Sequence, residues 1–324
     1  MPAWALREGR LLMETLYAIF IGPFVAMASD PAYFATVLIG GLLSGVLYSL
    51  VALGFVLIYK ASGVFNFAQG TMVLFAALNF AGSIDSGAPI WLALVITVVV
   101  MVVLAYAAER LVLRPLVNQE QIILFMATIG ITYFLRGIGQ IVWGGDVRVL
   151  DVGLPGAPIL LGDVLIKSLD LLAALVAGSL VAALAIFFQK TVVGRALRAV
   201  ADDHQAALSV GIPLRSIWVI VWIAAGLVAL VAGIMWGSTL GSVQFSIEQV
   251  ALRALPVLIL GGFTSIPGAI VGGLIVGSTE KIAESYWGPL TGGAMEDWFA
   301  YMLALVFLLF RPQGLFGERI IERV

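Results

Sequence analysis

Polar side chains interrupt the long apolar runs of this chain at a few places, and the first is an amide-rich stretch. Asn66, Gln69 and Gly70 are spaced at i, i+3 and i+4, which would put them on one face of a helix. Asn79 lies further along the same apolar run and could continue that face. Amides buried among apolar groups need hydrogen-bond partners. The pattern fits either a polar strip that lines a substrate path or hydrogen bonds between helices that fix their packing.

A second stretch, residues 190–215, mixes charged and apolar side chains and is not an ordinary polar loop. Residues 194–201 predict a helix that extends the apolar run before it. Asp202 or Asp203 can cap a second, short helix at about 203–209.

Gly211 is well placed to end that second helix. A short amphipathic helix needs an apolar surface to pack on, and the acids among its bases disfavour a lipid surface. We therefore expect this stretch to bind a groove on a partner protein.

Few charged residues lie inside the apolar runs, and Arg136, Arg253, Glu280 and Lys281 are the ones nearest to membrane depth. An ionisable group at membrane depth is a functional candidate by default. All four lie within a turn or two of one end of their runs, so we expect their side chains to extend to the membrane surface. A carrier driven by protons or ions would then lack its usual buried coupling groups.

The usual residues of catalytic and metal sites are scarce. The chain has no Cys and one His, which excludes thiolate chemistry and disfavours a metal or acid–base site built on His. It has no P-loop pattern G-x-x-x-x-G-K-[ST]. We expect no catalytic residue, metal or cofactor in this chain, which disfavours a membrane enzyme. If ATP drives its function, another chain must bind the ATP.

The elements that position these residues are lipid-embedded helices. The chain has 324 residues, of which 62% are apolar and 11% charged, and its mean hydropathy is +1.10. Soluble domains contain about 25% charged residues, and a soluble protein of this size could not bury so much apolar surface. A net charge of −2 disfavours a nucleic-acid binder. The fold class that we expect is an all-α polytopic membrane protein with about 8–10 transmembrane helices.

The expected helices follow the apolar runs, most of which are near the length of about 20 residues that spans a bilayer. The runs are 11–28, 33–59, 64–82, 90–108, 122–143, 169–189, 216–240, 250–264, 267–283 and 298–310. The runs 250–264 and 267–283 are short and contain Gly and Pro, so they form either two crossings or one broken helix. With the N-terminus inside, two crossings place most of the 17 Lys and Arg residues on the inner side, as positive charge favours.

Two regions follow from these runs. Residues 1–30 form an apolar N-terminal extension, which is an extra span, an interfacial helix or a signal-like segment. Residues 31–324 form a single transmembrane domain that contains the loop 190–215. Small residues recur along two of its runs, as at Gly41 and Gly45 in one and Gly273 and Gly277 in the other. Such spacing lets helix backbones pack closely in lipid.

Several motifs together resemble one family, the permeases of branched-chain amino acid ABC transporters. The motifs, in chain order, are Leu42–Tyr59 (LLSGVLYSLVALGFVLIY), Asn66–Gly70 (NFAQG), Gly194–Ala199 (GRALRA), Leu255–Gly262 (LPVLILGG), Pro267–Gly273 (PGAIVGG) and Arg311–Gly317 (RPQGLFG). They extend from about residue 33 to the end of the chain. The segment before residue 30 departs from the family pattern.

The resemblance implies a type II ABC importer permease-like bundle in the bacterial inner membrane. The chain would pair with a second paralogous permease subunit, two ABC ATPase subunits that hydrolyse ATP, and an extracytoplasmic solute-binding protein. The loop 190–215 would couple to an ATPase through Gly194, Arg195, Leu197, Arg198, Asp202, Asp203, Ala206, Ala207 and Gly211. Asn66, Gln69, Gly70 and Asn79 are the candidates for the substrate pathway.

The resemblance makes branched-chain amino acids the expected cargo, with urea or short amides as the alternative within the family. An ATP-independent channel or secondary carrier is a further alternative, which predicts uptake by this chain alone. The residues by themselves do not establish the direction of transport.

Overall fold

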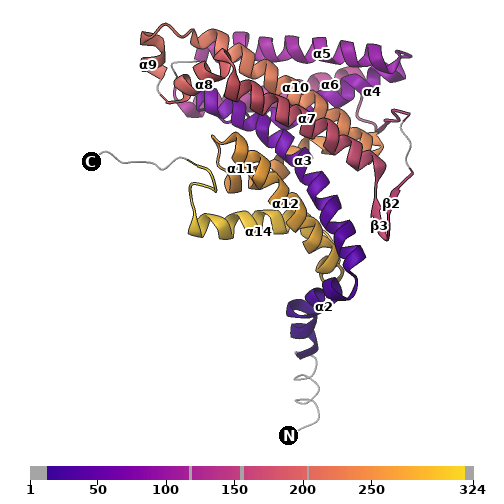
Figure 1. The fold of residues 1–324 in the computed structure, drawn as a ribbon. Helices are drawn as coiled ribbons and strands as arrows, with labels where there is room; N and C mark the ends of the chain where they lie inside the picture. Colours follow the sequence, from indigo (N-terminus) through magenta and orange to yellow (C-terminus); the bar gives the residue numbers. More distant parts are fainter. Residues whose placement is uncertain (1–12, 117–118, 154–156, 203, 318–324) are drawn as a thin grey trace.

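The computed structural model describes residues 13–116, 119–153, 157–202 and 204–317, and it shows a bundle of helices (Figure 1). Residues 13–20 are helical. The remaining helices are α2 (Gly22–Ser29), α3 (Pro31–Ser62), α4 (Gln69–Asp85), α5 (Ile90–Ala107), α6 (Gln121–Trp143), α7 (Ser168–Lys190), α8 (Val192–Asp202), α9 (His204–Ser209), α10 (Leu214–Leu240), α11 (Val250–Gly261), α12 (Ile266–Tyr286), α13 (Gly288–Thr291) and α14 (Met295–Phe310).

Short irregular helices and strands complete the described chain. The helices η1 (Ala108–Leu113) and η2 (Arg114–Leu116) continue α5, and η3 (Phe245–Gln249) leads into α11. Strand β1 (Arg148–Val149) pairs antiparallel with β4 (Ser242–Val243), and β2 (Ile159–Leu161) pairs antiparallel with β3 (Val164–Ile166). The β2–β3 hairpin lies at the opposite end of the bundle from α8 and α9 (Figure 1). We call the end at α8 and α9 the inner end, following the charge bias.

Six helical stretches of the described chain are long and apolar enough to cross a membrane: Pro31–Ser62, Ile90–Leu116, Gln121–Trp143, Ser168–Lys190, Leu214–Leu240 and Ile266–Tyr286. The apolar helices α4, α11 and α14 are shorter, with 17, 12 and 16 residues. At 1.5 Å per residue, α11 is about 18 Å long, which is less than the hydrocarbon core of about 30 Å. The all-α polytopic fold class is confirmed.

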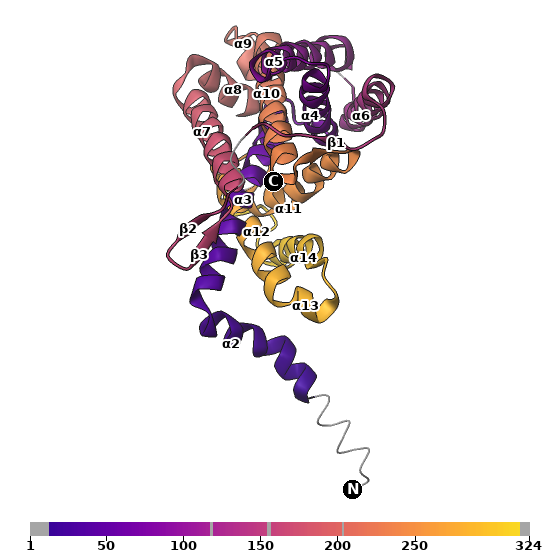
Figure 2. The same cartoon turned by 90° about the vertical axis from the view of Figure 1, so that its right-hand side faces the viewer.

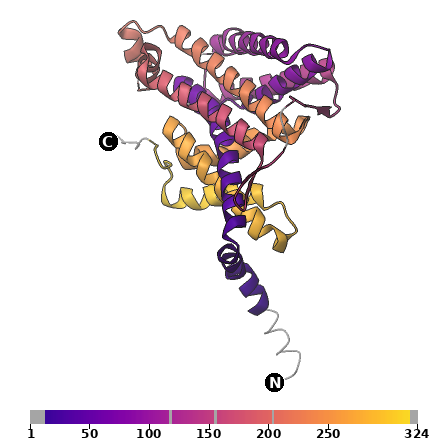
Figure 3. The same cartoon turned by 45° about the vertical axis from the view of Figure 1, so that its right-hand side comes forward.

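Helix α3 is the central element of the bundle. Its 32 residues begin where the Asp30 side chain accepts a hydrogen bond from the backbone N–H of Tyr33 (2.9 Å), with Pro31 in the first turn. It ends at Gly63, whose φ of 67° lies in the left-handed region that favours glycine. Helices α11 and α12 pack along one part of α3 and α7 and α10 along another (Figure 3).

Helices α3 and α12 pack closely through small residues, as their spacing predicts. A Cβ atom on Gly45 would lie 2.6 Å from the carbonyl oxygen of Gly273, and one on Gly41 would lie 2.7 Å from that of Gly277. The Ser49 hydroxyl bonds to the carbonyls of Gly45 (2.8 Å) and Ile270 (3.1 Å). This contact places backbone against backbone, which is how small residues stabilise helix pairs in lipid.

Helices α11 and α12 are two separate helices packed as an antiparallel pair and not one broken helix, and the two membrane crossings expected here stay a prediction. A Cβ atom on Gly261 would collide with the backbone of Gly268. Ser265 begins α12 by accepting a hydrogen bond from the N–H of Gly268 (3.0 Å). The C-terminal segment bonds to the end of α11, because the N–H of Leu315 donates to the carbonyl of Leu260 (2.7 Å).

The described part of the N-terminal extension, residues 13–29, extends away from the bundle beyond the start of α3 (Figure 2). It contacts the segment after α12, where the Trp287 indole N–H donates to the carbonyl of Ile19 (2.9 Å). The Phe24 and Trp287 rings meet edge to face, with centroids 5.6 Å apart. The role of residues 1–30 remains a prediction, and residues 1–12 lie outside the described part of the chain.

Candidate functional site

The first candidate region is a pair of buried amides, Asn66 and Gln69, which we call the amide cluster. Both side chains are fully buried. The Asn66 Nδ2 donates to Gln69 Oε1 (3.2 Å), and Gln69 Nε2 donates to the carbonyl of Ala225 in α10 (3.4 Å). The amides therefore satisfy each other and attach the start of α4 to a neighbouring helix.

The amide cluster stabilises a break in the chain, which corrects the expectation that Asn66, Gln69 and Gly70 share one helical face. Asn66 lies in the non-helical segment before α4, and α4 begins at Gln69. The physical reason is local, because Asn66 Oδ1 accepts a hydrogen bond from the N–H of Ala68 (3.2 Å) and so replaces a helical bond. The predicted apolar run 64–82 is helical only from Gln69.

The chain turns back along α3 across this break. Phe65 stacks on Phe55 of α3, with ring centroids 4.9 Å apart and an interplanar angle of 16°. Gln69 packs against Gly54, where a Cβ atom would collide with the Gln69 amide. Helix α4 therefore begins beside the interior of α3 and not beside its end.

A cavity of about 400 Å³, which we call the central cavity, opens next to this break. Its walls come from α3, the segment before α4, α4, α6, η3 and α11. Phe55, Phe65, Leu252 and Leu255 make much of the wall apolar. Gly70 also lines it, and a Cβ atom there would lie 2.7 Å from Cβ of Ala251, so glycine lets the starts of α4 and α11 meet.

One ion pair lies in the wall of the central cavity. Nη1 of Arg136, from α6, is 3.0 Å from Oε1 of Glu248, from η3, and the two side chains are 42% and 21% exposed. Glu248 lies in the segment between α10 and α11, outside the long candidate spans. Burial raises the pKa of its carboxyl group, and the Arg136 charge and the Thr71 hydroxyl oppose that rise.

The four residues expected in the substrate pathway occupy three different settings. Gly70 lines the central cavity, whereas Asn66 and Gln69 lie behind its wall, hydrogen-bonded to each other. Asn79 lies on α4 and accepts a hydrogen bond from the Thr97 hydroxyl of α5 (3.2 Å), away from the cavity.

Sequence spacing did not identify Arg136 and Glu248 as neighbours, because they lie far apart in the chain.

A second polar region corrects the expectation that Glu280 extends to the membrane surface, whereas Arg253 and Lys281 are ion-paired there and stay 31% and 37% exposed. Glu280 is fully buried and accepts a hydrogen bond from the Tyr48 hydroxyl (2.5 Å). Arg253 bonds to the Tyr48 hydroxyl (3.3 Å) and pairs with Glu296 (3.1 Å), which also pairs with Lys281 (2.5 Å).

Nε of Arg253 also pairs with Asp297 (2.8 Å). We call this group, Tyr48, Arg253, Glu280, Lys281, Glu296 and Asp297, the charged cluster. Its members come from α3, α11, α12 and α14. The only sequence signal for it was the presence of charge inside apolar runs, because partners on four helices cannot be matched by spacing. Arg136, the fourth of these residues, is likewise paired in the central cavity.

The stretch 190–215 folds as two helices at the inner end of the bundle, α8 and α9. The second matches the short helix expected at about 203–209, and Gly211 follows it with a φ of 86°. The first is a separate helix and not an extension of α7, which corrects the prediction for 194–201. Thr191, with ψ of 166°, is extended and divides α7 from α8.

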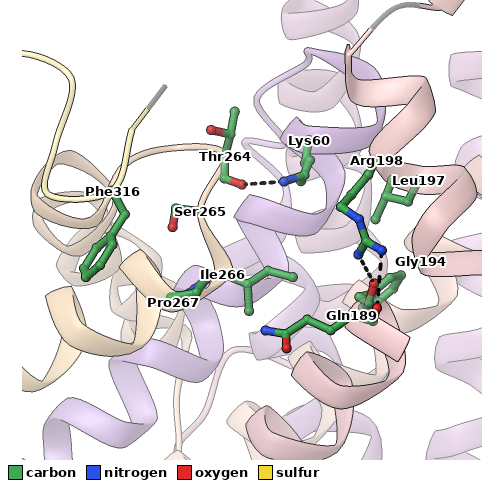
Figure 4. Close-up of a pocket in the computed structure, with 11 residues that line it drawn as sticks. Lys60, Gln189, Gly194, Leu197, Arg198, Thr264, Ser265, Ile266, Pro267 and Phe316 are labelled. Carbon is green, nitrogen blue, oxygen red and sulfur yellow. Dashed lines mark hydrogen bonds between the residues drawn. The ribbon is translucent and has the colours of Figure 1, made fainter. Parts of the chain in front are cut away.

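Helix α8 folds back onto the end of α7 through two residues (Figure 4). Arg198 donates to the last carbonyls of α7, at Phe188 (2.7 Å) and Gln189 (3.3 Å), which would otherwise lack partners. Gly194 lies so close to the Phe188 carbonyl that a Cβ atom would collide with it. Leu197 is buried beneath the same contact.

A small pocket of about 170 Å³ separates α8 from the start of α12. Lys60, Gly194, Arg198 and Phe316 line it together with residues 264–267 (Figure 4). Lys60 donates to the carbonyl of Thr264 (3.2 Å). The ends of α3, α7 and α11 therefore meet α8 at one place.

The other expected coupling residues occupy the same segment. Arg195 bonds weakly to the carbonyl of Lys190 (3.4 Å), Ala207 is buried, and the Ala206 carbonyl accepts the N–H of Val210 (3.2 Å). Asp202 is the last residue of α8, and its side chain lies outside the described part of the structure. Asp203 also lies outside the described residues.

Comparison with known proteins gives consistent relatives. BraD, the high-affinity branched-chain amino acid transport system permease protein of Pseudomonas aeruginosa, is 29% identical over 301 residues, which cover 89% of this chain and 97% of that protein. LivH, the protein of the same description in Escherichia coli K12, is 29% identical over 327 residues, covering 92% of this chain and 100% of LivH.

A likeness to a solved structure is weaker. PsaBC from Streptococcus pneumoniae in complex with Fab is 14% identical with a TM-score of 0.48, and the match covers 86% of this chain and 92% of that one. This similarity is too low to support a conclusion.

The family match covers most of the chain, since residues 37–310 match the family described as branched-chain amino acid transport system / permease component. The chain therefore belongs to this family of transport permeases.

Proposed function

We propose that this chain is one membrane subunit of an ABC importer in the inner membrane, which moves branched-chain amino acids into the cytoplasm. It works with a second paralogous permease, two ATPase subunits and an extracytoplasmic binding protein. The family membership and the cargo named for BraD and LivH support this proposal. The central cavity also suits the cargo, because its wall is mainly apolar.

The observation that carries the proposal is the fold of α8 and α9. Leu197, Val200 and Ala207 are buried within the chain, whereas Leu208 and Val210 are 56% and 80% exposed at the inner end. These exposed apolar side chains suit a groove on an ATPase subunit. A displacement of α8 would reach α7 through the Arg198 hydrogen bonds and α3 through direct packing.

ATP hydrolysis is assigned to the partner subunits, since this sequence has no P-loop. The chain then contributes a pathway whose opening depends on helix movement. The short helices α4 and α11 begin side by side at Gly70, next to the central cavity. Such interrupted elements are tolerated at membrane depth where they line a cavity, and they are suited to change the cavity when α12 moves.

Purification of the complete complex in mild detergent tests the partner assignment. We expect the second permease and the ATPases to co-purify with the wild-type chain, and Leu208→Asp to release the ATPases while the two permeases stay together. Leu161→Asp is the matched control, because Leu161 is 69% exposed on the β2–β3 hairpin at the opposite end. Retention of the ATPases by Leu208→Asp would remove α9 from the interface.

Uptake into proteoliposomes tests the function itself. We expect leucine uptake to require ATP, the binding protein and all the subunits. Gly194→Ala should separate ATP hydrolysis from uptake, because the added methyl group displaces α8 from Phe188. Uptake of leucine by this chain alone, down a gradient and without ATP, would contradict the importer assignment.

The ATP-independent carrier has one observation in its favour, which is the buried carboxyl group of Glu280. A proton-coupled carrier needs such a group in contact with the substrate path. Glu280 does not line the central cavity, and its neighbours are the charged cluster. The importer therefore remains the better supported function.

A further inference from the structure

The central cavity combines two kinds of surface that match the two parts of an apolar amino acid. Phe55, Phe65, Leu252 and Leu255 supply apolar surface from three elements of the wall. Arg136 and Glu248 supply one positive and one negative group on the same wall. The volume of about 400 Å³ lies within the range of about 300–1,000 Å³ typical of small-molecule sites.

Stability alone is a weak reason for a helix bundle to contain the Arg136–Glu248 ion pair. A charged pair removed from water loses hydration, and an apolar pair of similar volume often gives equal or greater stability. Arg136 nevertheless remains 42% exposed beside the cavity, where a ligand can reach it. Oε2 of Glu248 makes no hydrogen bond with the described residues. That oxygen is itself buried, so the carboxylate has acceptor capacity that its partner does not use and that a cargo reaches when the side chain turns toward the cavity.

We propose that Arg136 and Glu248 form a binding site for the charged head of an α-amino acid during its passage through this subunit. The Arg136 guanidinium accepts the cargo carboxylate, and the Glu248 carboxylate accepts the cargo ammonium group. The apolar part of the wall contacts the cargo side chain. This inference rests on the proposed function and adds to it a recognition site within the permease.

The pairing suits transport because it makes binding reversible. In the empty cavity the two charges neutralise each other at 3.0 Å. A zwitterion replaces one ion pair by two, so the net gain is smaller than the combined strength of the two new contacts. A permeation site must bind well enough to admit the cargo and weakly enough to release it. A lone charge in the wall would instead bind one end of the cargo and repel the other.

The site also separates the cargo classes that the family resemblance leaves open. Urea and short amides are uncharged, so they gain little from a pair of full charges. A free acidic or basic side chain would meet the apolar wall formed by Phe65 and Leu255 and would lose its hydration there. The geometry selects a zwitterion with an apolar side chain.

The test measures leucine uptake and ATP hydrolysis by the complete importer in proteoliposomes, over a range of leucine-loaded binding protein. Glu248→Gln keeps the shape and an oxygen for Arg136 but removes the charge that faces an ammonium group. The double variant Arg136→Met/Glu248→Met removes both charges with little change in volume. The control is Asp85→Asn, which makes the same acid-to-amide change in the Arg148–Asp85 pair, away from the central cavity.

We expect Glu248→Gln to lower leucine uptake at least about tenfold, because the cargo loses one hydrogen bond to a charged group. Stimulated ATP hydrolysis should stay near the wild-type rate. The double variant should show the same uncoupling with an unchanged thermal melting temperature. Asp85→Asn should match the wild type in both assays.

Wild-type uptake by Glu248→Gln would overturn the proposal, and that single isosteric change decides the matter if the double variant does not fold. Equal losses of uptake and ATP hydrolysis would indicate a merely structural ion pair and would also overturn it. Failure of the proposed function is read separately, from a wild-type importer that moves no leucine or that moves urea instead.

Discussion

The amide cluster and the charged cluster are both polar regions of an apolar bundle, yet they adjoin different surroundings. The amide cluster lies at a break in the chain, directly behind the wall of the central cavity. The charged cluster joins α3, α11, α12 and α14, and none of its six members lines that cavity. In one region polar groups allow a helix to begin inside the bundle, and in the other they hold several helices together.

The difference concerns what each cluster leaves free to move. The two amides use bonds within one short segment plus one carbonyl of α10, so they attach the start of α4 by neutral hydrogen bonds, with Thr71 beside the Glu248 carboxyl group. The charged cluster uses ion pairs among four helices, next to the close glycine contact of α3 with α12. We infer that α3 and α12 move as one unit, and that the cavity changes shape on its α4 and α6 side.

The first prediction tests the charged cluster, where the largest effect is expected. Glu280→Ala leaves the Tyr48 hydroxyl without its buried acceptor, whereas Arg253 keeps its bonds to Tyr48, Glu296 and Asp297. Removing one partner from a buried charged network typically costs about 3–5 kcal/mol, so we expect a loss of stability of about 3 kcal/mol. Denaturant unfolding in mixed micelles measures it.

The control for this prediction is Glu280→Gln, which retains an oxygen for the Tyr48 hydroxyl. Its cost should be clearly smaller than that of Glu280→Ala. If both variants unfold like the wild type, the charged cluster does not hold the four helices together, and the comparison between the two clusters fails.

The second prediction concerns the amide cluster and is of intermediate size. Gln69→Leu preserves volume but leaves Nδ2 of Asn66 with only the Met72 sulfur, at 3.8 Å. A buried polar group without its partner costs about 1–3 kcal/mol, so we expect a loss of about 2 kcal/mol, together with reduced leucine uptake.

A double-mutant cycle with Asn66→Leu isolates the contact between the two amides. The double variant should be less destabilised than the sum of the two single variants, because each change removes the partner of the other. Strict additivity would show that the two amides do not act as a pair.

How much of this was visible in the sequence depends on how far apart the partners lie. The close packing of Gly45 on Gly273 was predictable, because each helix shows its small residues at regular spacing. Asn66 and Gln69 were also recognised as a group, since they are three residues apart. Their helical face was not correct, because the apolar run conceals a break that depends on the Asn66 side chain bonding to its own backbone.

The charged cluster could not be assembled from the sequence. Arg253, Glu280 and Glu296 lie on three helices, and no pattern within one helix shows how its neighbour is aligned. Position along an apolar run therefore did not predict the burial of Glu280, since it suggested a side chain that extends to the membrane surface. The same limit applies to the Arg136–Glu248 pair, which needs α6 and η3 to be placed together.

The third prediction has the smallest effect and separates polarity from pathway. Asn79 shares α4 with Gln69, but it only accepts a hydrogen bond from the Thr97 hydroxyl, which also bonds to the carbonyl of Ala93 (2.8 Å). In Asn79→Leu the Thr97 hydroxyl therefore keeps an acceptor. Hydrogen bonds between membrane helices contribute about 0.6 kcal/mol on average, so we expect a loss of about that size in the same unfolding assay, with leucine uptake unchanged. A strong loss of uptake by a stably folded Asn79→Leu would instead extend the pathway along α4, and the contrast between polar groups that adjoin the cavity and those that only join helices would no longer hold.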